Sequence, residues 1–215
     1  MEFYIDTANL AEIKKAVEYG VISGATTNPS ILAKEGNISP KQRILEIIEL
    51  VKGPVSVEVL ALDAEGMIKE AVEYDRWSPN VVVKIPIIKE GLKAVKKLSS
   101  VGIKTNVTVC MNSSQALLAA MNGATYVSLF YGRIGDMGYD PVEVIKETKM
   151  LFEREKLDSK IIIGSIRSVL DINRSISAGA DIITIPYKFL EMLIEHPKTD
   201  ETVKEFLNAW SSVKR

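Results

Sequence analysis

A lysine inside a run of apolar residues is the first feature of the sequence that could do chemistry. The segment 81–86 reads Val-Val-Val-Lys-Ile-Pro, and short β-branched runs of this kind are typical of strands buried on both faces of a parallel sheet. Burial disfavours the charged form of Lys84, and a neutral amine is a nucleophile for carbonyl groups. The alternative is a lysine whose stem packs while its ammonium reaches solvent or a carboxylate at the strand end. The segment by itself leaves both interpretations open.

The rest of the chain must position Lys84, and its pattern predicts eight strands, each followed by a helical segment. Strict alternation is typical of a parallel sheet, and eight such units favour a closed (β/α)8 TIM barrel of the α/β class. An open doubly wound sheet is the alternative, but Gly132, Gly135 and Gly138 lack the spacing and position of a dinucleotide-binding fingerprint. We interpret these glycines as a flexible or turn-forming loop. The predicted strands are 3–6, 24–29, 54–59, 81–85, 104–109, 126–130, 161–165 and 181–186.

Composition narrows the class of protein. The pattern shows no linker or low-complexity tract, so residues 1–215 are expected to form one domain with an extra helix at about 201–210. A net charge of -1 provides no basic surface for nucleic acid. Cys110 is the single cysteine, which excludes an intramolecular disulfide framework and fits a reducing cytoplasm. No apolar run approaches the length of a membrane span and the N-terminus lacks a signal-peptide pattern, so we expect a cytoplasmic protein without a membrane partner.

Polar side chains gather where the predicted strands end, which in a (β/α)8 barrel is the rim that carries the active site. Barrel interiors are usually filled with valine, isoleucine and leucine, so this many polar residues indicates a functional rim. The strand-end residues are Asp6, Thr26, Asn28, Glu58, Lys84, Asn106, Thr108, Ser128, Phe130 and Ser165, and the loops that follow add Arg133 and Arg167.

Each of these residues also has a purely structural interpretation. Asp6 could cap the following helix, and Asn28, which precedes a proline, could be a turn former. The hydroxyl groups of Thr108 and Ser128 could bond to local backbone. Glu58 is different, because a carboxylate between valines on a central strand needs a partner or a raised pKa.

Taken together, an amine, two carboxylates and several hydroxyl and amide groups suit carbonyl chemistry through a Schiff base. One carboxylate can shuttle protons while a carbinolamine dehydrates and a carbon–carbon bond breaks. Arg133, Ser165 and Arg167 suggest an anion site, because barrels often bind phosphate at the loops after strands seven and eight. The set points to a ketose phosphate, with no metal and no redox cofactor. The single histidine, His196, lies near the C-terminus, and no cluster of histidine and cysteine offers a transition-metal site.

Several short motifs resemble the transaldolase family, and more narrowly its short subfamily, which also contains the fructose 6-phosphate aldolases. The resemblance runs the whole length of the chain, through the segment 196–200 and the final helix with Trp210. The motifs are Asp6-Thr7-Ala8-Asn9, Thr26-Thr27-Asn28-Pro29-Ser30, Val83-Lys84-Ile85-Pro86, Thr105-Asn106-Val107-Thr108, Phe130 with Gly132-Arg133, and Ser165-Ile166-Arg167.

The resemblance implies a role for each rim residue. Lys84 would form the Schiff base, and Asp6 would be the acid/base group, working through a water held by Glu58 and Thr108. The other residues would bind substrate: Asn28, Asn106 and Ser128 the dihydroxyacetone unit, Arg133, Ser165 and Arg167 the phosphate, with Thr26 in support and Phe130 beside them. The resemblance further implies a homo-oligomer, typically a decamer in which the C-terminal helix reaches a neighbour. The implied activity is a transaldolase of pentose phosphate metabolism. Its donors would be fructose 6-phosphate or sedoheptulose 7-phosphate, and its acceptors erythrose 4-phosphate or glyceraldehyde 3-phosphate.

Two positions favour one activity within the family. The aldolases carry glutamine where Glu58 stands and tyrosine where Phe130 stands, so this chain has the transaldolase residues. An aldolase that releases free dihydroxyacetone is the alternative, and a barrel that only binds sugar phosphates is a third possibility. Leu129, Gly135 and Gly164 depart from the usual proline, acidic residue and alanine of the family, and all three lie on or near strand six and the phosphate end.

Overall fold

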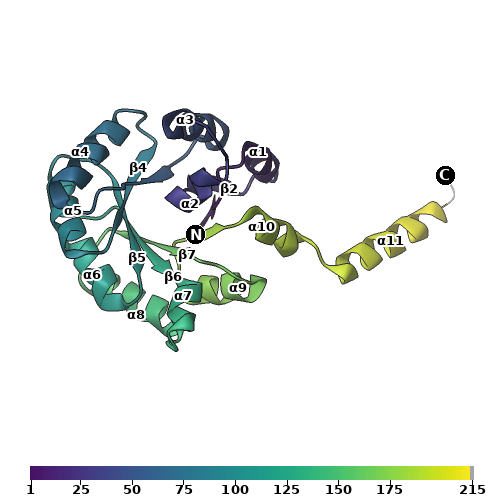
Figure 1. The fold of residues 1–215 in the computed structure, drawn as a ribbon. Coiled ribbons are helices and arrows are strands. Elements are labelled where there is room, and N and C mark those ends of the chain that lie inside the picture. Colours follow the sequence, from purple (N-terminus) through teal and green to yellow (C-terminus); the bar gives the residue numbers. More distant parts are fainter. Residues whose placement is uncertain (214–215) are drawn as a thin grey trace.

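The computed structural model of the protein describes residues 1–213, and within them eight parallel strands close into a barrel surrounded by helices (Figure 1). The strands pair in chain order, and the last pairs with the first, which closes the sheet. The (β/α)8 barrel predicted from the alternating pattern is confirmed. The strands are β1 (Glu2–Ile5), β2 (Ile22–Thr26), β3 (Val55–Glu58), β4 (Val81–Pro86), β5 (Thr105–Cys110), β6 (Tyr126–Phe130), β7 (Lys160–Gly164) and β8 (Ile182–Ile185).

Most helices begin at a side-chain cap, in which an Asn, Asp or Ser oxygen accepts a hydrogen bond from a free backbone N–H of the first turn. Asn9 caps the first helix in this way, and Pro40 and Pro141 occupy first-turn positions, where a missing N–H costs nothing. The helices are α1 (Leu10–Glu18), α2 (Pro29–Ala33), α3 (Pro40–Val51), α4 (Ala64–Asp75), α5 (Lys89–Ser100), α6 (Ser113–Met121), α7 (Tyr131–Asp136), α8 (Pro141–Arg154), α9 (Val169–Ser177), α10 (Tyr187–Ile194) and α11 (Pro197–Ser211).

The twofold alternation of the strands separates two apolar layers. Val83 and Ile85 of β4 belong to the large core between the barrel and its helices. Tyr4, Ile162 and Ile182 form a separate buried cluster, which occupies the opposite, inward face of β1, β7 and β8. Further along the same inward face the residues become polar or small. The apolar inner layer therefore supports a polar layer at the carboxyl ends of the strands.

The segment with three glycines differs from the prediction of a loop, because Tyr131–Asp136 forms α7. Tyr131 and Ile134 are buried and anchor this short helix to the core. The Gly132 N–H donates to the Ser165 carbonyl, and a Cβ on Gly132 would lie 2.6 Å from that oxygen. Only a glycine fits there, so the loops after β6 and β7 come into direct contact. Gly138, with a positive φ of 82°, does form the turn that was expected.

The C-terminal helix is longer than predicted, since α11 begins at Pro197 rather than near residue 201. The ring nitrogen Nδ1 of His196 accepts a hydrogen bond from the Lys198 N–H and caps this helix. In Figure 1 α11 extends away from the barrel, and none of its residues is buried. Among residues 1–213 no helix combines the length and the hydropathy needed to cross a membrane.

Candidate active site

A pocket of about 160 Å³ opens at the carboxyl ends of the strands. It draws residues from β2, β4, β6, β7 and β8 and from the segment after β1, as expected for the functional face of a (β/α)8 barrel. Its lining consists of Asp6, Thr26, Asn28, Lys84, Ser128, Phe130, Arg133, Gly164, Ser165 and Thr184. Four predicted site residues, Glu58, Asn106, Thr108 and Arg167, do not line the pocket.

Lys84 lies on β4 with its side chain only 7% exposed. Its Nζ atom lies 3.0 Å from a carboxylate oxygen of Glu58 and donates a hydrogen bond of 3.3 Å to the Thr27 carbonyl. The register of β3 and β4 sets Glu58 directly beside Lys84, so the strand pairing itself creates the ion pair. Glu58 thereby has the partner that a carboxylate among valines requires. The lysine amine faces the pocket, and its neighbours hold it in one place.

Asp6 follows β1 and points at the same pocket. Its carboxylate oxygen Oδ1 accepts a hydrogen bond of 2.7 Å from the Thr26 hydroxyl. Burial raises the pKa of Asp6, and the bond from Thr26 and the charge of Lys84 offset that effect only in part. Asp6 does not cap α1, because Asn9 has that function. A partly buried carboxyl group with a raised pKa, in the same pocket as an amine, suits proton transfer.

Asn106 lies behind the pocket in a buried network. Its amide nitrogen donates to the Ser56 hydroxyl at 3.1 Å, and its amide oxygen accepts from the Ser128 hydroxyl at 2.7 Å. Asn106 is fully buried, so Ser128 rather than Asn106 presents a polar atom to the pocket. Asn106 therefore does not line the pocket, and its role in binding the dihydroxyacetone unit stays a prediction.

Thr108 is also fully buried, and its hydroxyl has no hydrogen-bond partner among residues 1–213. The next residue, Val109, has a φ of 64°, which is strained for a β-branched residue. The pairing of β5 with β6 shifts register at this point. The irregular backbone redirects the end of β5, so simple alternation does not apply beyond Thr108.

The two predicted phosphate arginines are placed differently. Arg133 lines the pocket, with its guanidinium carbon 5.7 Å from the centre of the Phe130 ring. Arg167 instead makes two hydrogen bonds of 2.5 Å to the Asp136 carboxylate, and both side chains are about half exposed. This guanidinium holds the pKa of Asp136 below its ordinary value. Arg167 therefore does not line the pocket, because an acidic residue of α7 holds its guanidinium group, and its role in phosphate binding stays a prediction.

Ser165 lies between these groups, with a φ of 59° in the left-handed region. Strained non-glycine residues of this kind concentrate at functional sites. Its carbonyl accepts a hydrogen bond from the Gly132 N–H, and this bond holds the serine in its left-handed conformation at the pocket wall.

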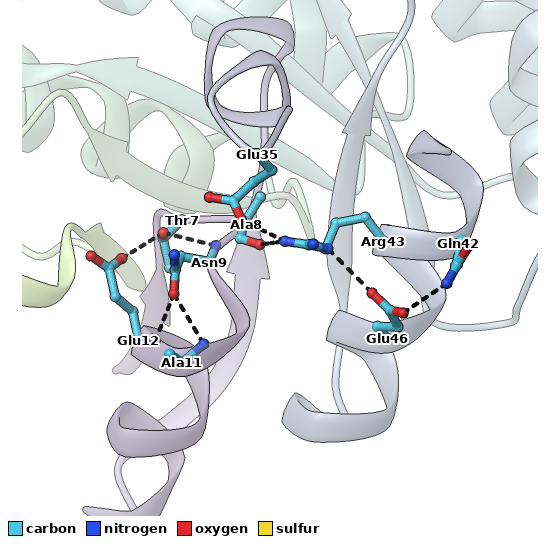
Figure 2. Close-up of polar contacts among 9 residues, drawn as sticks. All are labelled: Thr7, Ala8, Asn9, Ala11, Glu12, Glu35, Gln42, Arg43 and Glu46. Atoms are coloured by element: carbon cyan, nitrogen blue, oxygen red, sulfur yellow. Dashed lines mark hydrogen bonds and ion pairs between the residues drawn. The ribbon is translucent and has the colours of Figure 1, made fainter. Parts of the chain in front are cut away.

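The loop that follows Asp6 is fixed from outside the barrel (Figure 2). Arg43 of α3 donates hydrogen bonds to the Ala8 carbonyl at 2.7 Å and to Glu35 at 2.6 Å. The arginine side chain is only 12% exposed, so this ion pair is well sheltered from water. The same side chain therefore holds the loop after Asp6 and the segment after α2. Asn28 begins α2 by accepting a hydrogen bond from the Ile31 N–H, which leaves its amide nitrogen for the pocket.

Sequence reasoning missed two polar residues of this rim. Thr184 of β8 lines the pocket, and its hydroxyl lies 2.6 Å from the Thr26 hydroxyl. Ser56 of β3 supports Asn106 from below. A threonine alone among isoleucines in β8 was a usable signal, because it marks a polar side chain on a buried strand.

Fold and pocket together define a class of protein: a (β/α)8 barrel with a buried lysine and a partly buried carboxyl group facing one polar pocket at the carboxyl ends of its strands. The comparisons with known proteins agree with this class. The family model Transaldolase/Fructose-6-phosphate aldolase matches residues 3–215. The chain therefore belongs to the transaldolase/fructose-6-phosphate aldolase family, as its motifs predicted.

Similar proteins come from several organisms. The chain is 49% identical over 215 residues to a probable transaldolase of Carboxydothermus hydrogenoformans, covering all of both chains. It is 48% identical to a probable transaldolase of Aquifex aeolicus, covering 99% of this chain and 98% of the other. A probable transaldolase of Thermoplasma volcanium is 45% identical, with 99% and 96% covered. The protein is thus an enzyme of the transaldolase/aldolase family.

Proposed function

We propose that the protein is a transaldolase that moves a dihydroxyacetone unit from a ketose phosphate to an aldose phosphate through a Schiff base on Lys84. The observation that carries the proposal is the buried Lys84 amine, facing the same pocket as the carboxyl group of Asp6. A buried amine that is held in place is suited to attack a carbonyl carbon.

The amine of Lys84 adds to the ketose carbonyl, and loss of water leaves a protonated imine. Asp6 takes the proton of the hydroxyl next to the bond that breaks, and the carbon–carbon electrons pass to the imine. An aldose phosphate leaves and the remaining three-carbon unit stays bound as an enamine. Addition of an acceptor aldehyde and hydrolysis then reverse these steps and free the lysine.

The surrounding residues support the roles that the sequence predicted. The orphan hydroxyl of Thr108 needs a partner, which a water bound also to Glu58 would provide. Ser128 and the free amide nitrogen of Asn28 are positioned to hold the dihydroxyacetone hydroxyls. Arg133 and Ser165 form the phosphate end, and Arg167 would join them by exchanging Asp136 for phosphate.

Transfer is preferred to release because Phe130 lines the pocket and has no hydroxyl group to donate a proton to the enamine. The test is an assay for glyceraldehyde 3-phosphate formed from fructose 6-phosphate, with and without erythrose 4-phosphate. Sodium borohydride is added in parallel samples and the protein is digested for mass spectrometry. We expect product that depends on the acceptor and a reduced adduct at Lys84. Product without acceptor would indicate the aldolase activity, and a missing adduct would indicate a barrel that only binds sugar phosphates.

We also propose that the protein is a cytoplasmic homo-oligomer, a decamer by resemblance, in which α11 packs against another copy. Val203, Phe206, Leu207 and Trp210 share one face of α11 at helical spacing, and all are exposed in the single chain. An apolar face of this size is typical of an interface. Light scattering of the full chain should give a multiple of 23.7 kDa, and Phe206→Ser with Trp210→Ser should reduce the mass. A monomeric wild-type protein would contradict this proposal.

A further inference from the structure

A chain of three hydrogen-bonding groups crosses the seam where the barrel closes. The Thr184 hydroxyl of β8 lies 2.6 Å from the Thr26 hydroxyl, which in turn lies 2.7 Å from the Asp6 carboxylate. Thr184 and Thr26 are 5% and 3% exposed, so bulk water does not compete for these bonds. Both threonines also line the pocket.

Barrel closure creates this arrangement. In the pairing of β1 with β8 Tyr4 stands opposite Thr184, and the Asp6 N–H donates to the Ile185 carbonyl. The last strand therefore brings its only polar side chain next to the carboxyl group that follows the first strand. Thr184 lies one inward position above Ile182, which belongs to the apolar inner layer.

The charge state of Asp6 decides which group donates each hydrogen bond in this series of three groups. An ionised Asp6 only accepts, so the Thr26 hydroxyl must give it its hydrogen. The Thr26 oxygen is then free to accept, and Thr184 is the group that donates to it. When Asp6 carries a proton on Oδ1, it donates to the Thr26 oxygen, and the Thr26 hydroxyl turns to donate to the Thr184 oxygen. The Thr184 hydroxyl then turns its own hydrogen toward the pocket that it lines, so the two hydroxyls reverse together.

We propose that Thr184 is a positioning residue for acid–base catalysis, which orients the Thr26 hydroxyl toward Asp6 and allows that hydroxyl to reverse when Asp6 takes up a proton. The role rests on the proposed function, because it requires Asp6 to exchange protons during turnover. Thr184 acts through Thr26 and does not itself touch the reacting atoms.

Removing the Thr184 hydroxyl has a defined consequence. Thr26 loses the donor that polarises its O–H bond, so it becomes a weaker donor to the Asp6 carboxylate. A protonated Asp6 can carry its hydrogen on the other carboxyl oxygen, so it loses less stabilisation than the ionised form. The ionised form is therefore the more affected one, and the acid limb of kcat/KM should move to higher pH by roughly half a unit to one unit. We expect kcat to fall about tenfold, which is less than the loss of a whole acid–base group would cause. KM should stay within about twofold of the wild-type value.

The variants are Thr184→Val, which keeps the shape but lacks the hydroxyl, and Thr184→Ser, which keeps the hydroxyl. Thr105→Val is the matched control, since Thr105 is a buried β5 residue whose hydroxyl has no partner within residues 1–213. Full pH profiles of kcat and KM are measured for all three, together with the borohydride adduct at Lys84 and the melting temperature. If Thr184→Val does not fold, Thr184→Ala replaces it.

The proposal expects Thr184→Val alone to be impaired, with a shifted acid limb, while Thr184→Ser and Thr105→Val behave like the wild-type protein. It is overturned if Thr184→Val keeps the wild-type profile, or if Thr184→Ser is equally impaired, because side-chain volume would then explain the loss. A wild-type protein without an adduct at Lys84 overturns the proposed function and this role with it. A wild-type adduct with an unaffected Thr184→Val overturns this role only.

Discussion

The two ends of the pocket are built in opposite ways. At the lysine end, the side chains of Lys84 and Glu58 are 7% and 18% exposed, and Asp6 is held through a buried chain of threonine hydroxyls. At the arginine end, Arg167 and Asp136 pair with 54% and 55% of their side chains exposed. One end is fixed by strands and the other by loops and α7.

The difference indicates a division of labour. Groups that exchange protons or form covalent bonds need low exposure and fixed geometry, and the strands of the barrel supply both. A group that binds a phosphate must give up one partner for another, which an exposed ion pair permits because it contributes little stability. Substitutions at the lysine end should therefore change kcat, whereas those at the arginine end should change KM.

The largest effect is expected for Lys84→Ala. If Lys84 forms the proposed Schiff base, removing its amine should lower transfer activity by at least about a thousandfold. The coupled assay measures activity, and mass spectrometry should find no borohydride adduct. Lys93→Ala, at an exposed lysine paired with Glu90, is the control and should keep full activity. Substantial activity in Lys84→Ala would contradict the proposed catalytic role of Lys84.

Asp6→Asn should cost activity and add stability. Loss of the acid/base group should lower kcat about a hundredfold or more. Because burial raises the pKa of Asp6 above its ordinary value of 3.8, the folded protein keeps the Asp6 proton over a range of pH in which the unfolded chain has already lost it. The resulting destabilisation is absent below the ordinary pKa, grows as pH rises from the ordinary to the raised pKa, and is constant above the raised one.

Urea denaturation of wild-type and Asp6→Asn protein measures this effect. The variant should have the higher midpoint at pH 8, and the difference should shrink at pH 4. A variant that is less stable than the wild-type protein at pH 8 would contradict the assigned direction of the pKa shift.

Arg167→Ala tests whether the outer arginine reaches the substrate. If it exchanges Asp136 for phosphate, its loss should raise KM for fructose 6-phosphate about tenfold and leave kcat within about twofold. Steady-state kinetics provide both numbers, and Arg154→Ala, at an exposed arginine of α8, serves as the control. An unchanged KM would leave Arg133 and Ser165 as the whole phosphate end.

The smallest effect is expected for Asp136→Asn. Removing the charge that holds Arg167 outside the pocket should lower KM by about twofold or less at low salt, because exposed ion pairs are weak. The difference from wild type should disappear at 0.5 M salt, where screening reduces the attraction in both proteins. A rise in KM would instead show that Asp136 orients Arg167 for binding.

Much of the fold was readable from local pattern. The alternation of apolar strands with amphipathic helices determined the barrel, and polar residues at the ends of the first seven predicted strands marked the rim. Lys84 and Glu58 could be recognised in this way because each is the one charged residue among valines on its strand. Their position directly beside one another followed only from the register of β3 and β4, which the sequence pattern does not give.

The tertiary structure decided which of these polar groups reach the substrate and which serve one another. Thr184 meets Thr26 across 158 residues, through the pairing that closes the barrel, and no local pattern encodes that contact. Arg167 is held by Asp136, which lies 31 residues away on α7, a helix that was predicted as a loop because of its glycines. Asn106 lies behind Ser128, where its buried amide group is hydrogen-bonded to neighbouring side chains. The residue types and their face of the barrel followed from the sequence, whereas their partners depended on strand register, barrel closure and loop packing.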